Sequence, residues 1–118
     1  MVSDADVIHE WLTVPDIVER TGAPLQQVKR WFQERDLVGV RRGENRALAV
    51  PSSFLDPEGP LPALRGTITV LGDGGLSDEE IVDWLLAEDL SLPGGSAIAS
   101  LRSGSKTEVR RRAQEHAF

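Results

Sequence analysis

Residues 13–51 read TVPDIVERTGAPLQQVKRWFQERDLVGVRRGENRALAVP, and this segment constrains the architecture more than any other. Its Thr13-x-x-Asp16 pattern is a variant of the capping box that begins a helix. Gly22 predicts the end of that helix, because glycine readily takes the left-handed C-cap conformation. A second helix is predicted from Pro24 to Arg35, so a tight turn separates the two helices.

The predicted second helix has two distinct faces. Leu25, Val28 and Phe32 fall at i, i+3 and i+7, which makes an apolar face that can pack on the first helix. A polar stripe on another face consists of Gln26, Lys29, Arg30 and Gln33. The packed apolar faces would hold this stripe at a fixed angle.

A two-stranded hairpin is predicted after the second helix. Leu37–Arg41 and Arg46–Val50 are rich in β-branched residues, Gly43-Glu44-Asn45 is typical of a turn, and Pro51 stops the return strand. Its tip carries Arg41, Arg42 and Arg46.

Charge is segregated along a chain of 118 residues with a formal net charge of −6 and a pI of about 4.8. Residues 24–50 carry six bases against three acids, and residues 102–112 carry five against one. Residues 1–19 carry five acids and residues 76–90 carry six, and neither segment contains a Lys or an Arg. A basic segment in an acidic protein creates a directed field, although the same pattern also fits ordinary solvated surface.

The remaining segments predict a mainly α protein with a small β-hairpin, in which a winged helix-turn-helix precedes a helical C-terminal domain. We expect two domains, residues 1–58 with an acidic N-terminal tail and residues 59–118. The expected elements are a short helix or ordered arm over 7–12, a linker over 51–65 with a helical turn at 53–55, a strand over 66–71, a turn over 72–75, a helix opened by the Ser77/Glu80 capping box, a short helix over 96–101, and a last helix opened by a Ser105/Glu108 capping box.

Several functional classes are disfavoured by composition. The chain has no cysteine and two histidines, which excludes thiolate metal sites and disfavours a His-rich metal site. No apolar run is long enough to span a bilayer and no secretory signal is evident, so we expect a cytoplasmic protein without cofactors. Gly72-Asp73-Gly74-Gly75 lacks the pattern of a phosphate loop, and neither histidine has a nearby nucleophile, so no enzymatic activity is expected.

The ordered set of helices, glycine turn and arginine hairpin is what DNA reading requires, because a helix fits the major groove. Gln26, Gln27 and Arg30 lie in the N-terminal part of the second helix and are candidate base readers. Candidate contacts to phosphates or the minor groove are Lys29, Arg35, Arg41, Arg42, Asn45 and Arg46. The sequence leaves open whether Arg110–Arg112 also help on DNA or are balanced by the acidic 76–90 segment.

The segment Thr13–Pro51, with VKRWF at 28–32, LVGVRR at 37–42 and RALAVP at 46–51, resembles the winged helix-turn-helix of MerR- and excisionase-type proteins. The whole chain resembles a family of small actinobacterial winged-helix DNA-binding proteins with a C-terminal domain of unknown function. The tail that carries this likeness has WLL at 84–86, SLPGG at 91–95, ASLRSG at 99–104 and KTEVRRRAQ at 106–114. The resemblance implies a transcriptional regulator that binds double-stranded DNA. It also implies control by a Ser/Thr kinase in the N-terminal tail, where Ser3 is the hydroxyl residue before Thr13.

A second interpretation concerns the C-terminal half. Its Trp-Leu, Leu-Pro-Gly-Gly and Leu-x-x-Gly succession is similar to the toxin-binding domain of Xre-type antitoxins. A plain helical cap that packs on the first half, with or without forming a homodimer, explains the same pattern. The alternative function is therefore a protein–protein adaptor or antitoxin-like module that holds a protein partner through this half.

Overall fold

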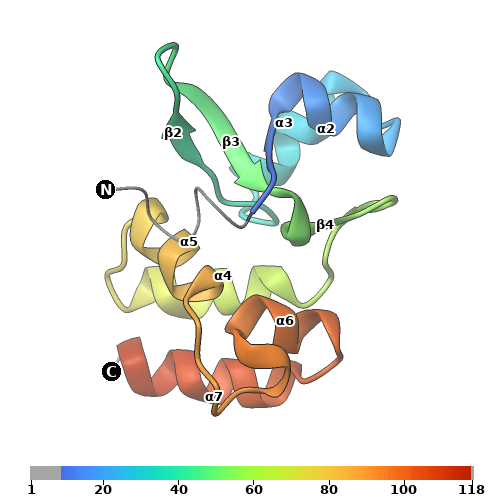
Figure 1. Cartoon of the computed structure of the whole chain (residues 1–118). Coiled ribbons are helices and arrows are strands. Elements are labelled where there is room, and N and C mark those ends of the chain that lie inside the picture. Colours follow the sequence, from blue (N-terminus) through green and yellow to red (C-terminus); the bar gives the residue numbers. More distant parts are fainter. Residues whose placement is uncertain (1–8, 118) are drawn as a thin grey trace.

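The computed structural model describes residues 9–117. The protein is mainly α-helical with a small β-hairpin, as the sequence predicts (Figure 1). The tail before residue 9, including Ser3, lies outside the described residues. No described helix is long and apolar enough to cross a membrane.

The first half builds a small sheet beside two helices. Helices α2 (Val14–Thr21) and α3 (Leu25–Gln33) agree with the two predicted helices to within two residues at each end. Strands β2 (Val40–Arg42) and β3 (Ala47–Pro51) form the antiparallel hairpin. The segment over 7–12, expected as a short helix or an ordered arm, is not helical at its described end: Trp11–Thr13 form strand β1, which pairs with β3 and makes the sheet order β1-β3-β2. Pairing with β3 gives the backbone of β1 its hydrogen-bond partners, which a short isolated helix would lack.

The predicted first strand of the hairpin begins three residues later than expected. Leu37 and Val38 are buried without being part of a strand. The N–H groups of Asp36 and Leu37 both donate to the carbonyl of Trp31, which turns the chain back under α3. Gly39 then passes so close to β3 that a Cβ atom there would lie 2.7 Å from the Ala49 carbonyl oxygen. Only a residue without a Cβ atom fits at this position, and the strand pairing of the hairpin begins at the next residue, Val40.

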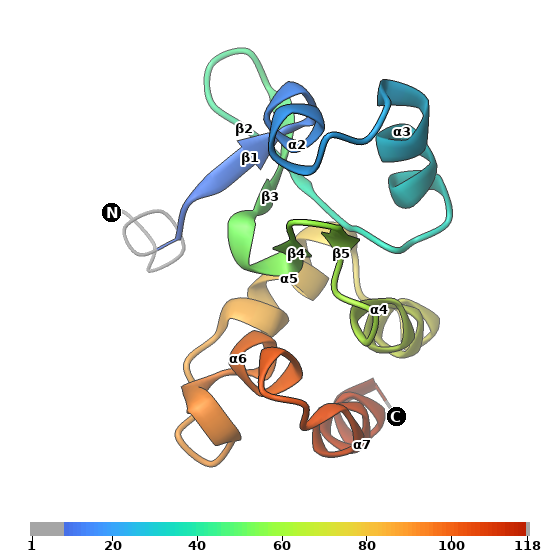
Figure 2. The same cartoon turned by 90° about the vertical axis from the view of Figure 1, so that its right-hand side faces the viewer.

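The second half consists of helices joined to the sheet by a short connection. A 3-10 turn (Ser52–Phe54) and the two-residue strands β4 (Leu55–Asp56) and β5 (Gly59–Pro60) make this connection. The helices are α4 (Leu64–Asp73), α5 (Asp78–Leu86), α6 (Ala97–Arg102) and α7 (Lys106–Ala117), with a 3-10 turn at Pro93–Gly95. Helices α4 and α7 lie side by side in both cartoon views (Figures 1 and 2).

The strand predicted over 66–71 is wrong, because this segment lies inside α4. Its β-branched residues favour a strand locally. However, Leu64, Thr67, Ile68 and Leu71 fall at i, i+3, i+4 and i+7 and all are buried. Packing of this face against the rest of the core outweighs the weak local propensity.

One of the two capping boxes predicted in the second half forms, and the start of α6 has a side-chain cap that was not predicted. Ser77 and Glu80 form the predicted capping box, and the Ser96 side chain caps α6. The box predicted at Ser105 and Glu108 does not form: the Ser105 N–H donates to the Ser100 carbonyl, so it is not available to Glu108. The carboxylate of Glu108 instead accepts from Arg111 and Arg112.

One continuous hydrophobic core joins the two halves, from Leu12 in β1 to Ala113 in α7. Polar contacts also cross between them. The guanidinium of Arg102 donates to the carbonyls of Ser53 and Leu55 and pairs with Asp56 at 3.1 Å. The α2–α3 unit and the hairpin are thus held on a helical base, and the two-domain division at residue 58 stays a prediction.

Candidate nucleic-acid interface

Helices α2 and α3 are fixed against each other by local capping and by buried side chains. Asp16 accepts hydrogen bonds from the backbone N–H and the hydroxyl of Thr13, at 2.9 and 3.0 Å, and these bonds lower the pKa of its carboxyl group. Gly22 has a φ of 73°, the left-handed conformation expected for the turn. Ile17 and Val28 are fully buried between the helices and the sheet. The position of α3 is therefore set by the core.

The outward face of α3 carries most of the predicted polar stripe. Gln26, Lys29, Arg30 and Gln33 are all exposed. Gln27 is half-buried, and it points about 160° away from Lys29 because the two residues are two positions apart on a helix of 3.6 residues per turn. Gln27 thus lies toward the side of Trp31, which packs on Gly59.

The three arginines at the hairpin tip point to different sides of the sheet. Side chains alternate along a strand, so Arg41 and Arg42 lie on opposite faces. The Arg42 guanidinium lies 3.9 Å from the ring centroid of Trp11. Arg41 is exposed on the other face, and its guanidinium donates to the carbonyl of Arg46 at 3.3 Å. Arg46 is exposed and, together with Asn45, belongs to the turn itself.

A groove separates α3 from the hairpin, and both elements contribute a cation to it. This groove has a volume of about 440 Å³, and its lining includes Lys29, Phe32 and Gln33 from α3 and Arg41 and Leu48 from the hairpin. Lys29 and Arg41 have no carboxylate partner among residues 9–117. Two unpaired cations from separate elements therefore face one concave surface, which we call the α3–hairpin groove.

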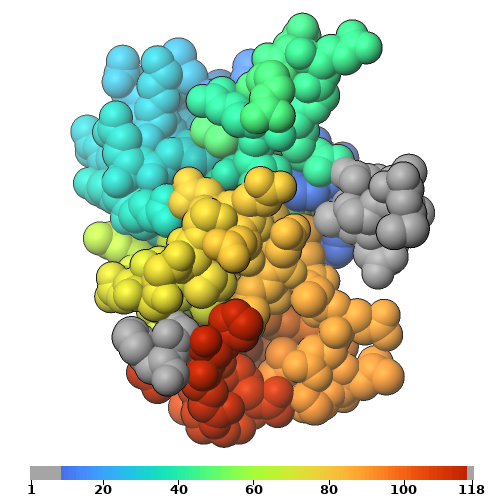
Figure 3. Space-filling view, turned by 90° about the vertical axis from the view of Figure 1, so that its left-hand side faces the viewer, coloured from blue at the N-terminus to red at the C-terminus, as the bar shows by residue number. Residues whose placement is uncertain are grey.

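A second cleft lies on the other side of Arg41, between the hairpin and α5. It has a volume of about 470 Å³, and its lining includes Arg35, Arg41, Arg46, Asp78 and Glu79. The space-filling view shows α3, the hairpin and the start of α5 meeting on one face of the molecule (Figure 3). We call this second concavity the hairpin–α5 cleft. Arg41 lines both concavities and joins them into one cationic face.

Arg35 occupies an unusual position at the end of α3. Its N–H donates to the Phe32 carbonyl while the next N–H donates to Trp31, which is the hydrogen-bond pattern of a Schellman motif. The residue in that position adopts a left-handed conformation, and Arg35 has a φ of 65° where glycine is favoured. Its guanidinium pairs with Asp78 at 2.9 Å.

The structure thus brings together four of the nine predicted site residues, namely Lys29, Arg35, Arg41 and Arg46. Gln26, Arg30 and Asn45 are exposed nearby but line neither concavity, while Gln27 and Arg42 are turned elsewhere. Gln33 was not among the predicted site residues, although its spacing of four from Lys29 could have identified it.

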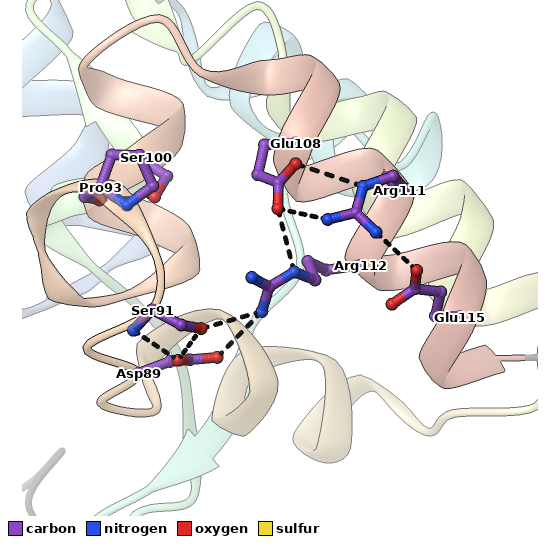
Figure 4. A network of polar contacts seen from close by, with 8 residues as sticks. All are labelled: Asp89, Ser91, Pro93, Ser100, Glu108, Arg111, Arg112 and Glu115. Atoms are coloured by element: carbon purple, nitrogen blue, oxygen red, sulfur yellow. Dashed lines mark hydrogen bonds and ion pairs between the residues drawn. The ribbon is translucent and has the colours of Figure 1, made fainter.

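The arginines of α7 are engaged in a different way. Arg111 pairs with Glu108 and Glu115, each at 2.6 Å, and Arg112 pairs with Glu108 and with Asp89 (Figure 4). The hydrogen bond from Arg111 is the main cause of a lowered pKa at Glu108. These ion pairs neutralise much of the basic C-terminal segment, which also lies at the opposite end of the molecule from the hairpin tip (Figure 1).

The described residues contain no cluster of three or more His, Cys, Asp or Glu side chains that could hold a metal ion. Lys29 and Arg41, which have no carboxylate partner among residues 9–117, give the α3–hairpin groove the chemistry of an anion-binding surface.

Comparison with known proteins places the chain in a family. Residues 61–117 match the family described as the Rv2175c C-terminal domain of unknown function. A curated relative, the DNA-binding protein Rv2175c of Mycobacterium tuberculosis, is 32% identical over 117 residues, an alignment that covers 89% of this chain and 79% of the relative. The chain belongs to the Rv2175c family.

The solved structures support the same family. The NMR structure of Rv2175c matches with a TM-score of 0.83 at 29% identity, over 99% of this chain and 87% of that chain. The family match over residues 61–117 and the curated relative confirm the predicted resemblance to a DNA-binding family with a C-terminal domain of unknown function. The likeness of the first half to MerR- and excisionase-type proteins stays a prediction.

Proposed function

We propose that this member of the Rv2175c family binds double-stranded DNA through the face that α3 and the β2–β3 hairpin form, and that it acts as a transcriptional regulator rather than as an enzyme. The observation that carries the proposal is the pair Lys29 and Arg41, two exposed cations from separate elements that line one groove. The name of the curated relative, a DNA-binding protein, supports the same function.

In this proposal α3 enters the major groove and the hairpin acts as a wing on the flanking backbone. A major groove is wide enough to admit a helix, and the exposed Gln26 and Arg30 have the side chains that read base edges. Lys29 and Arg41 would neutralise phosphates and set the register of the helix on the duplex.

The negative charge of the rest of the molecule supports selective binding. Non-specific affinity comes mainly from counterion release by many Lys and Arg contacts. Here the net charge is −6, and α7 has its Arg111 and Arg112 paired with carboxylates. We therefore expect weak affinity for random DNA and a steep dependence on salt.

The two lysines of the chain offer a matched test, because both are exposed on helices and only Lys29 belongs to the proposed face. Lys29→Gln and Lys106→Gln remove the same charge. Fluorescence anisotropy with a labelled duplex, selected from sheared genomic DNA by the wild-type chain, would be recorded from about 50 to 200 mM salt.

Lys29→Gln should weaken binding several-fold and reduce the slope of log K against log salt by about 0.9, the value for one phosphate contact. Lys106→Gln should leave the slope unchanged. Equal losses in the two variants would place the duplex elsewhere. A wild-type chain that selects no DNA but retains a stoichiometric protein partner would favour the adaptor alternative.

A further inference from the structure

The hairpin–α5 cleft combines three guanidinium groups with two carboxylates. Arg35, Arg41 and Arg46 come from the first half of the chain, whereas Asp78 and Glu79 come from the start of α5. The second half of the chain thus contributes negative charge directly beside the cationic face. Capping of α5 does not require Asp78 and Glu79 to lie beside the arginines, because Ser77 and Glu80 already cap this helix.

Two of the three arginines stand where the backbone favours glycine. Arg35 and Arg46, with φ values of 65° and 53°, are the two non-glycine residues of positive φ among residues 9–117. Left-handed conformations are unfavourable for residues with a Cβ atom and concentrate at functional sites. Both side chains line the same cleft. An arginine in such a place is explained if its guanidinium is needed there.

The guanidinium of Arg35 is already held by an anion. Asp78 accepts at 2.9 Å, and both side chains are about half exposed, with relative accessibilities of 40% and 55%. An ion pair in contact with water is weakly held. A backbone phosphate group, with one negative charge shared by two non-bridging oxygens, offers a guanidinium the same charge and the same two-point geometry as a carboxylate does.

We propose that the hairpin–α5 cleft is a second phosphate subsite of the DNA interface. In the free protein the carboxylate of Asp78 is paired with the guanidinium of Arg35, and a backbone phosphate displaces it when DNA binds. This inference rests on the proposed DNA-binding function and adds a role for the second half of the chain. Arg41 connects the subsite to the α3–hairpin groove, so one strand of the duplex can continue from one concavity to the other. Asp78 then lowers affinity for every duplex and makes Arg35 available only to a correctly docked one.

The test compares two charge-neutralising substitutions on α5. Asp78→Asn removes the competing carboxylate, and Asp83→Asn removes the same charge from an exposed position on α5 outside the cleft. The full-length variants would be titrated with the selected duplex by anisotropy, after thermal melts have shown that they are folded. We expect Asp78→Asn to bind several-fold more tightly than Asp83→Asn.

A double-mutant cycle with Arg35→Gln separates competition from a general charge effect. Arg35→Gln alone should weaken binding and reduce the salt slope by about 0.9. In the Arg35→Gln background, Asp78→Asn should give no more than the small gain of Asp83→Asn, because the group for which it competes is gone.

The inference is overturned if Asp78→Asn and Asp83→Asn have equal effects, or if Asp78→Asn weakens binding, which would mean that Asp78 orients Arg35. These outcomes differ from failure of the proposed function. If the proposed function fails, neither the wild type nor any variant binds the duplex. If only the phosphate subsite fails, the wild type still binds the duplex and Lys29→Gln still weakens that binding.

Discussion

Arg46 gives a prediction in which stability and binding change in opposite directions. Its φ of 53° at the hairpin turn favours glycine, and its side chain is exposed. We compare Arg46→Gly with Arg46→Ala, which lose the same charge but differ in backbone freedom. Relief of the left-handed conformation is worth about 1–2 kcal/mol. Glycine also gives the unfolded chain more conformational entropy, which offsets about 0.4–1 kcal/mol of this gain.

The net difference is therefore about 1 kcal/mol in the free energy of unfolding in favour of the glycine variant, or roughly 4 °C in Tm for a domain near this size. Urea unfolding and calorimetry would measure it. Arg46→Ala should stay close to the wild type, since both have a Cβ atom at this position. In the anisotropy assay both variants should lose the same affinity and about 0.9 of the salt slope. An alanine variant as stable as the glycine variant would refute the strain argument, and unchanged DNA binding in both would refute the role of the side chain.

Three further predictions concern stability. The hydroxyl of Thr67 is fully buried in α4 without a hydrogen-bond partner among the described residues, so Thr67→Val should raise the free energy of unfolding by about 1 kcal/mol in urea melts. Ser100→Ala is the control: that buried hydroxyl donates to the Pro93 carbonyl at 2.5 Å, and its removal should lower stability by about 1–2 kcal/mol; a loss at both sites would contradict the reasoning. Hydrogen bonds from Thr13 and Ser77 lower the pKa of the Asp16 and Glu80 carboxyl groups below their unfolded values, so their contribution is present above about pH 4 and is lost as the pH falls through the lowered pKa values; Tm should drop less steeply with acid in Asp16→Asn than in the wild type. Asp83 is exposed, but the partial loss of hydration beside its neighbours, followed by the charges of Glu79 and Glu80, raises the pKa of its carboxyl group, so its ionisation destabilises the fold at neutral pH. Asp83→Asn should raise Tm at pH 7 and have little effect near pH 3, and a gain that persists in acid would exclude a charge effect.

The sequence predicts the parts of the fold that short-range chemistry controls. Thr13, Gly22 and Ser77 mark helix ends because their caps involve residues only three or four positions away. The α4 segment has the local pattern of a strand because Thr67–Val70 are all β-branched, whereas its helical packing depends on helices that follow later in the chain. Strand β1 has no local signal for a similar reason, since its partner β3 lies almost forty residues further on.

The candidate site shows the same division. Helical phase and strand alternation could already have separated Gln27 from Lys29 and Arg42 from Arg41. By contrast, the ion pair between Arg35 and Asp78 joins residues from the two halves of the chain, and no periodicity in the sequence indicates it. A left-handed arginine at the end of α3 is equally invisible, because glycine is the residue that would mark such a position.

The face on which DNA docks can be observed directly. In an NMR titration of the ¹⁵N-labelled chain with the selected duplex, the account predicts that amide resonances of α3 (Leu25–Gln33) and of the β2–β3 hairpin shift, while those of α7 (Lys106–Ala117) stay in place. Shifts concentrated on α7, with α3 and the hairpin unchanged, would contradict it.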